Sequence, residues 1–184
     1  ARRMGRIIKN LRAFARQESE AITDVDLNAV VEAALEMMQA KISRSSVQTD
    51  WVAGPPAIVR GGEVRLQQVV MNLVSNAVDA METMDEDAPK WLTIRIETTA
   101  DIVRLTVSDT GPGITEPEKM FDPFYTTKEV GAAQGMGLGL SISYGLIQSF
   151  GGQIKGANRP EEQGGGATFT IELARAGHNQ EAAQ

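Results

Sequence analysis

Residues 67–81 read QQVVMNLVSNAVDAM, and the rest of the chain is organised around this stretch. Its apolar residues recur three and four positions apart, which is typical of a helix with one buried face. Gln68, Asn72 and Asn76 stand four residues apart and share a second face, with Asp79 three residues further on. A buried amide without a hydrogen-bond partner costs about 1 to 3 kcal/mol. The amides therefore need a partner, which the sequence leaves open as backbone, water or a ligand that carries a metal.

The chain of 184 residues is long enough for one buried core, and we expect one globular domain. The apolar fraction of 42% and the charged fraction of 23% are ordinary for an α/β protein. No apolar run approaches the roughly 20 residues that cross a bilayer. The absence of cysteine excludes disulfides and thiolate zinc sites.

The first residues of the chain differ in charge from the remainder. Residues 1–17 hold six basic side chains and no acidic one, so the remainder of this chain of net charge −6 carries −12. A basic end could suggest nucleic acid, but the acidic remainder would repel phosphate backbones. The apolar residues of this stretch alternate as in a coiled-coil seam: Met4, Ile7, Leu11 and Phe14. We interpret residues 1–19 as the C-terminal part of a dimerisation helix and residues 20–26 as a linker.

The hydrophobic pattern of residues 27–173 predicts an α+β fold. We expect a two-layer α/β sandwich, in which a mixed sheet of about five strands carries three helices on one face. Helices are predicted for residues 27–43, 62–84 and 140–150. Strands are predicted for residues 47–52, 57–60, 92–96, 103–107, 153–156 and 167–173. Residues 174–184 are predicted to form a disordered tail.

A carboxylate and two glycines follow the strand predicted at residues 103–107, in residues 109–114, DTGPGI. A carboxylate at the end of a strand can face a ligand whose flat edge approaches bare glycine backbone. An Asp-initiated turn with glycines at positive φ explains the same residues without a ligand. This motif alone leaves both interpretations open.

A second glycine cluster, residues 135–140, GMGLGL, runs directly into a predicted helix. Glycine amides at a helix N-terminus can bind an anion, but the pattern is neither GxxxxGK[ST] nor GxGxxG after a strand. A flexible linker is an equal alternative. Between the clusters, residues 121–128, FDPFYTTK, combine aromatic anchors with Lys128. Lys128 could reach a phosphate, or be one exposed lysine of a short packed loop.

The order and spacing of these motifs resemble the ATP-binding catalytic domain of sensor histidine kinases. The same superfamily holds gyrase, heat-shock chaperone and mismatch-repair ATPases. NLVSNAVDAM is similar to the N box, DTGPGI to the first glycine box, FDPFYTTK to the F box, GMGLGLSIS to the second glycine box and residues 166–169, GATF, to the last box. Residues 4–16, MGRIIKNLRAFAR, resemble the second helix of the family's dimerisation and phosphotransfer hairpin, as in nitrogen-regulation and C4-dicarboxylate sensors.

The resemblance implies ATP and Mg²⁺ as ligands. Asn76 would be the magnesium ligand, Asn72 a metal or phosphate contact, and Asp109 the partner of the adenine amino group. The second glycine box would form a lid over the phosphates. Further nucleotide contacts are implied in the glycine boxes and the last box: Gly111, Gly113, Ile114, Gly135, Gly137, Leu138, Gly139, Leu140 and Thr168.

Two positions depart from the family's pattern. Many members carry lysine or arginine where this chain has Asp79, so Lys128 becomes the expected basic phosphate contact, and Asp79 stays among the expected nucleotide contacts. In the ATP-hydrolysing branches the position of Asn72 typically holds a glutamate that activates water. An amide cannot accept a proton at neutral pH. Asn72 and Lys128 are the expected catalytic residues, and transfer to a nucleophile is favoured over hydrolysis.

The resemblance implies a protein-histidine kinase of a two-component system. It would transfer the ATP γ-phosphate to a histidine on a dimerisation helix absent from this chain, for relay to a response regulator. The one histidine, His178, lies in the tail without an adjacent acid, so we expect no autophosphorylation.

The resemblance also implies a homodimer in the full-length protein, in the cytoplasmic part of a bacterial inner-membrane sensor. Three alternatives remain: an ATP-hydrolysing conformational module of the chaperone or mismatch-repair type, a non-enzymatic interaction module with a vestigial nucleotide site, and a kinase that phosphorylates serine on a separate protein.

Overall fold

The computed structural model describes residues 20–123, 125 and 138–177, and all structural statements below concern these residues. Several predictions lie outside them. These are the dimerisation helix, most of the lid, the tail from residue 178 onward, and the residues Lys128, Gly135, Gly137 and His178.

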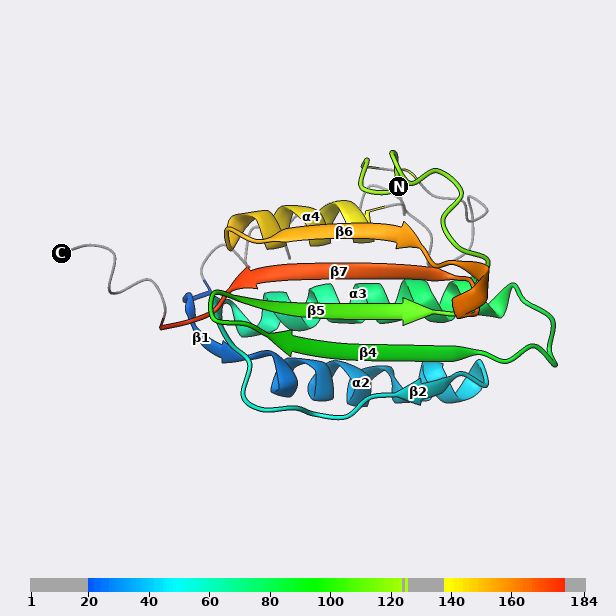
Figure 1. Cartoon of the computed structure of the whole chain (residues 1–184), viewed down its shortest axis with the longest axis horizontal. Helices are drawn as coiled ribbons and strands as arrows, with labels where there is room; N and C mark the ends of the chain where they lie inside the picture. The colour runs from blue at the N-terminus through cyan, green and yellow to red at the C-terminus, as the bar shows by residue number, and fades with distance from the viewer. Residues whose placement is uncertain (1–19, 124, 126–137, 178–184) are drawn as a thin grey trace, which may run out of the picture.

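The fold has two layers, a five-stranded sheet and three helices that all lie on one face of it (Figure 1). The strands lie in the order β2 (Gln48–Asp50), β4 (Trp91–Thr98), β5 (Ile102–Asp109), β7 (Ala167–Ala174) and β6 (Gln153–Asn158). β2 runs parallel to β4, and the other neighbouring strands are antiparallel. The predicted mixed sheet of about five strands is therefore confirmed.

The helices are α2 (Leu27–Arg44), α3 (Glu63–Glu82) and α4 (Gly139–Ser149), and a short 3-10 helix, η1 (Glu161–Gln163), joins β6 to β7. α3 packs against α2 on one side and α4 on the other (Figure 1). Its buried residues are Leu66 and the apolar ones that predicted a helix: Val69, Val70, Leu73, Val74, Ala77, Val78 and Met81. Asn72 and Asn76 are half-buried, so the amides lie along the margin of this buried face.

The start of α3 is capped from outside the helix. Its N-cap residue, Gly62, has no side chain, so it cannot satisfy the first N–H groups of the helix. Glu20 does so, because its carboxylate accepts from the backbone N–H groups of Val64 at 2.8 Å and Arg65 at 3.3 Å. A Cβ on Gly62 would lie 2.5 Å from Glu20 Oε2, so glycine leaves room for this carboxylate.

A second, two-stranded sheet was not foreseen. β1 (Thr23–Asp26) pairs antiparallel with β3 (Ile58–Gly61), although residues 20–26 were predicted to be linker. Only Val25 of β1 is buried, so the strand carries no apolar alternation that a sequence pattern could reveal. The strand predicted at residues 57–60 exists, but it belongs to this second sheet.

The first residues of the predicted tail are also bonded to β3. β7 continues to Ala174, Arg175 forms an isolated antiparallel bridge with Val59, and the Ala176 N–H donates to the carbonyl oxygen of Ile58 at 2.8 Å. Residues 174–177 thus depart from the predicted tail, because β3 offers them backbone partners more than a hundred residues away in sequence.

Replacing Glu20 with alanine should lower the free energy of unfolding by about 1 kcal/mol, the usual cost of losing a helix N-cap. Asp24→Ala is the matched control, since it removes only an exposed ion pair with Arg60 and should change stability by less than about 0.5 kcal/mol. Urea unfolding of both variants measures the difference. Equal effects of the two substitutions would contradict the capping role of Glu20.

Candidate functional site

Asn72 joins the two helices that border the candidate site. Its Nδ2 donates to the carbonyl oxygen of Gly139 at 3.3 Å and to Ser143 Oγ at 3.2 Å, both in the first turns of α4. Ser143 is fully buried, and its hydroxyl donates to the same Gly139 oxygen at 2.9 Å. The amide therefore holds the start of α4, where the second glycine box ends, against the middle of α3.

Asn76 lies one helical turn further along the same face of α3. It is half-buried, and its side chain makes no hydrogen bond with any residue in the described part of the chain. An amide oxygen is a hard donor of the kind that Mg²⁺ prefers. Asn76 is thus placed to bind a ligand from outside the protein.

Asp79 points toward α2 and forms an ion pair with the Lys41 ammonium, which also donates to Ser75 Oγ at 2.7 Å. The pair is largely shielded from water, with 9% of the Asp79 side chain and 15% of the Lys41 side chain exposed. A carboxylate in the position of the family's basic residue is therefore balanced by a lysine from the neighbouring helix. Direct nucleotide binding by Asp79 stays a prediction.

Asp109 ends β5 with a side chain that is only 3% exposed. Its Oδ1 accepts from the backbone N–H groups of Gly111 at 2.8 Å and Ala167 at 3.2 Å, while Oδ2 accepts from no described residue. Burial raises the pKa of Asp109 above its ordinary value, and the two hydrogen bonds and the charge of Arg159 oppose that rise. One oxygen of this largely buried carboxylate thus remains available for a ligand.

Two glycines let the chain wrap closely around Asp109. A Cβ on Gly111 would lie 2.9 Å from Asp109 Oδ1 and 3.2 Å from the Cβ of Ala80 on α3. Gly166 has φ of +88°, and a Cβ there would overlap the Asp109 carbonyl oxygen. Ala80 is one turn beyond Asn76, so this close approach brings the Asp109 loop to the face of α3 that carries the amides.

The remaining described contacts surround the same region. Thr168 pairs with Ser108 across the β5–β7 ladder, and their hydroxyl oxygens lie 2.8 Å apart. Ile114 and Leu140 are half-buried and pack against the core. Leu138 is the N-cap residue of α4 and has no side-chain cap. The structure therefore brings three segments around α3: the first glycine box, the described end of the second glycine box, and β7. Lys128, Gly135 and Gly137 lie outside the described residues.

The donor set fits a magnesium ion that arrives with a phosphate ligand. Within residues 20–123, 125 and 138–177, no three His, Cys, Asp or Glu side chains form a group that could hold a metal. Mg²⁺ usually keeps several waters and takes one or two protein ligands together with substrate phosphates. A single amide oxygen from Asn76 matches this mode of binding.

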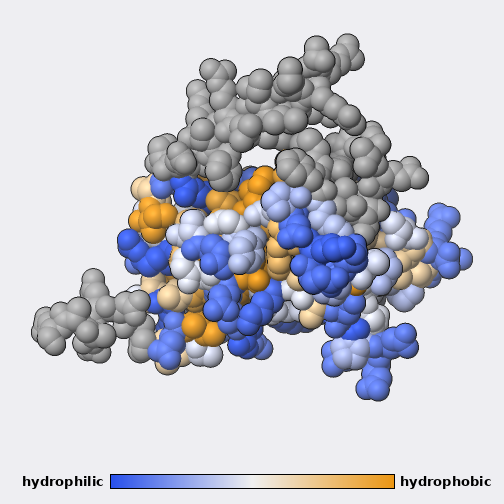
Figure 2. Space-filling view, turned by 90° about the horizontal axis from the view of Figure 1, so that it is seen from above, coloured by the Kyte–Doolittle hydropathy of each residue, from blue (hydrophilic) through white to orange (hydrophobic). Residues whose placement is uncertain are grey.

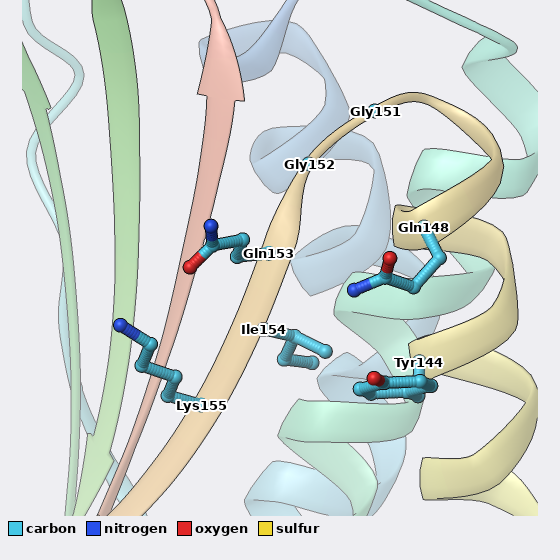
Figure 3. Close-up of a pocket in the computed structure, with 7 residues that line it drawn as sticks. All are labelled: Tyr144, Gln148, Gly151, Gly152, Gln153, Ile154 and Lys155. Carbon is cyan, nitrogen blue, oxygen red and sulfur yellow. The ribbon is translucent and has the colours of Figure 1, made fainter.

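An open cavity of about 410 Å³ lies elsewhere, between α4 and β6 (Figure 3). Tyr144, Gln148, Gln153 and Lys155 contribute to its walls, and none of the predicted contacts does. In the view from above, hydrophobic areas of the surface are separated by hydrophilic residues (Figure 2). Neither this cavity nor these surface areas indicate a ligand site other than the one that the motif residues form.

Sequence reasoning missed four side chains that shape the site: Lys41, Ser143, Asn158 and Arg159. Lys41 lies on a helix whose predicted role was only to form the core, and Ser143 is the last residue of the second glycine box, where no role was predicted for its hydroxyl. Asn158 ends β6 and Arg159 follows it, before a Pro-Glu-Glu turn, a pattern that signals a hairpin but not its neighbours. Their roles come from contacts with segments far away in sequence.

Comparison with known proteins gives a consistent result. Residues 61–177 match the family described as histidine kinase-, DNA gyrase B-, and HSP90-like ATPase. The C4-dicarboxylate transport sensor protein DctB of Rhizobium meliloti (strain 1021) is 34% identical over 180 residues, which cover 95% of this chain and 27% of that protein. DctB of Pseudomonas aeruginosa is 35% identical over 174 residues, 93% of this chain and 27% of that protein. The chain thus spans about a quarter of the length of these relatives.

Solved structures of kinase catalytic domains share the fold. The catalytic domain of histidine kinase ThkA, in a nucleotide-free form, superposes with a TM-score of 0.70 at 30% identity, covering 84% of this chain and 98% of that one. Histidine kinase ThkA in complex with response regulator protein TrrA gives a TM-score of 0.70 at 26% identity, covering 95% of this chain and 48% of that one.

The fold and the site together define an ATP-binding domain. The chain belongs to the histidine kinase-, DNA gyrase B- and HSP90-like ATPases, as the catalytic domain of a two-component sensor histidine kinase. The family resemblance and the α+β sandwich predicted from the sequence are thereby confirmed. No helix in the described ranges is both long and apolar enough to cross a membrane.

Replacing Asp109 with asparagine should raise the free energy of unfolding at neutral pH. The variant loses a buried charge, while its amide oxygen still accepts from Gly111 and Ala167. Because burial raises the pKa in the folded state, the contribution of Asp109 to stability is fully present below the ordinary value of 3.8 and is lost as pH rises through the raised value.

The stability gained by the Asp109→Asn variant should therefore be largest at neutral pH and shrink as the solution is acidified. Urea unfolding of both proteins between pH 7 and pH 4 measures this difference. A variant that is less stable than the original protein at pH 7 would contradict the account of a charge that burial destabilises.

Proposed function

We propose that the domain binds Mg²⁺ and ATP between α3, α4 and the Asp109 loop, with Asn76 as the protein ligand of the magnesium ion. One observation supports this most strongly. The half-buried amide of Asn76 has no partner among the described residues, and it stands one turn from Ala80, against which Gly111 packs. A nucleotide bound at Asp109 would therefore extend its phosphates along the amide-bearing face of α3.

Asp109 is proposed to recognise the adenine amino group. Its side chain is almost fully buried, its Oδ1 is fixed by two backbone N–H groups, and its Oδ2 accepts from no described residue and can accept from a ligand. The backbone of Gly111 and Gly113, with Ile114 and Thr168, would surround the base. The resemblance places Gly135, Gly137 and Gly139 in the lid over the phosphates and gives Leu138 and Leu140 as further nucleotide contacts. Lys128 is the proposed basic phosphate contact, so lid amides and an ammonium would neutralise charge.

Transfer of the γ-phosphate is favoured over hydrolysis by the chemistry of α3. Asn72 has its amide donors bonded to α4, and an amide does not take a proton from water at neutral pH. Asp79, the next carboxylate along α3 after Asn76, is held in its ion pair with Lys41. In the proposed reaction Asn72 would help to orient ATP, and neither Asn72 nor Asp79 would act as a base that activates water. A Mg²⁺ ion held by Asn76 would supply the charge neutralisation that phosphoryl transfer needs.

The proposed acceptor is a histidine on a dimerisation helix outside residues 1–184. The proposed partner after that step is a response regulator, which accords with the similarity to ThkA in complex with TrrA. We further propose a homodimer in the full-length protein, in a cytoplasmic location where ATP is available, and no role for nucleic acid. The hydrolysing module, the serine kinase and the vestigial binding module gain no supporting observation from the site.

The acceptor can be supplied separately to test this function. A purified helical hairpin that bears the acceptor histidine should gain acid-labile phosphate when it is incubated with this chain and labelled ATP in the presence of Mg²⁺. This chain alone should gain none, because its one histidine, His178, lies in the predicted tail without an adjacent acid and is not expected to accept phosphate. Stable labelling of this chain without the hairpin, or rapid ATP hydrolysis without transfer, would contradict the proposal.

A further inference from the structure

Asn158, at the end of β6, holds the first glycine box through both halves of its side-chain amide. Its Oδ1 accepts from the backbone N–H of Ile114 at 2.6 Å, and its Nδ2 donates to the carbonyl oxygen of Ile114 at 2.9 Å. This is the pairing that a neighbouring strand would offer, made here by one exposed side chain. Asn158 thus fixes the far end of a loop 44 residues away.

The loop leaves room for the Asn158 amide at Gly113. Gly113 adopts φ of +86°, which disfavours any residue with a side chain, and a Cβ there would lie 2.8 Å from Asn158 Oδ1. The glycine therefore serves both the backbone turn and the approach of the asparagine. Filling this position would displace the amide from Ile114.

The next residue holds the other end of the same loop. The Arg159 guanidinium donates from Nη1 to the carbonyl oxygen of Asp109 at 3.0 Å and from Nη2 to that of Gln163 at 2.5 Å. The backbone N–H of Arg159 also donates to Gly166 at 2.9 Å. Two consecutive residues thus hold the start and the end of residues 109–114, the segment that carries the buried carboxylate.

We propose that Asn158 is a positioning residue for recognition of the nucleotide base. It acts through the backbone of Gly113 and Ile114, which it keeps at a fixed distance from Asp109, and it does not itself contact the nucleotide. This inference rests on the proposed placement of adenine at Asp109. Asn158 is exposed, so its removal should disturb the shape of the loop more than the stability of the core.

The chain offers a matched control. Asn28 also uses both halves of its amide on backbone, since Oδ1 accepts from Gly54 N–H at 3.0 Å and Nδ2 donates to the Pro55 carbonyl oxygen at 2.9 Å. That clamp lies at the start of α2 and holds no predicted contact. Asn28→Ala therefore removes the same kind of interaction away from the candidate site.

The test measures dissociation constants of ATP, adenosine and GTP for the folded variants by calorimetry. Asn158→Ala should weaken ATP and adenosine binding equally, by about tenfold for two lost hydrogen bonds, and should reduce the preference for ATP over GTP. Asn158→Asp keeps the acceptor for the Ile114 N–H but loses the donor, so an intermediate effect is expected. Asn28→Ala should leave all three constants unchanged.

Three results would overturn the proposal. The first is an Asn158→Ala variant with unchanged affinity and unchanged base preference. The second is an equal loss of affinity in Asn28→Ala, which would show a general effect of destabilisation. If the original domain binds GTP as tightly as ATP, the placement of adenine at Asp109 fails, and the role of Asn158 fails with it. A lack of phosphate transfer to the hairpin would contradict the proposed transfer reaction but not the role of Asn158, because base binding is measured without transfer.

Discussion

The burial of α3 is the constraint on which the remaining structure depends. Eight apolar side chains of this helix are buried against the sheet and its two neighbouring helices. A fully buried side chain of this size contributes roughly 1.5 to 3 kcal/mol, so this burial outweighs the cost of half-buried amides on the same helix. Asn72 and Asn76 can therefore stand at the margin of the core, where one joins α4 and the other has no described partner.

Charge is distributed around this helix so that each buried group has a distinct role. Asp79 forms an ion pair with Lys41, so its charge on the side of α3 that faces α2 is compensated within the protein. Asp109 has no ion pair among the described residues, and its pKa is raised by burial. A buried carboxylate without an ion pair at the end of a strand costs stability, and such groups concentrate at functional sites. The two aspartates thus differ: Asp79 is paired within the fold, and Asp109 is the one proposed to recognise the ligand.

Periodicity and motif order predicted most of the fold, and motif order named the residues that the structure brings together in the candidate site. α3 and the two long strands followed from apolar spacing, and Asn72, Asn76 and Asp109 from the order of the motifs. β1 was not predictable, because only one of its four residues is buried. Pairing between distant side chains was also invisible to spacing, as for Lys41 with Ser75, 34 residues apart, and Asn158 with Ile114. Such contacts exist only once the sheet and the helices have packed.

The central claim is that the polar face of α3 binds ATP through magnesium at Asn76. Calorimetric titration of ATP into Asn76→Ala, with Mg²⁺ and with a chelator, tests it most directly. Gln67→Ala is the control, since that amide of the same helix bonds, among the described residues, only to Glu63. The account predicts that Asn76→Ala loses the part of ATP affinity that depends on Mg²⁺, while the control keeps it. An Asn76→Ala variant whose affinity still responds to Mg²⁺ as in the original domain would contradict the account.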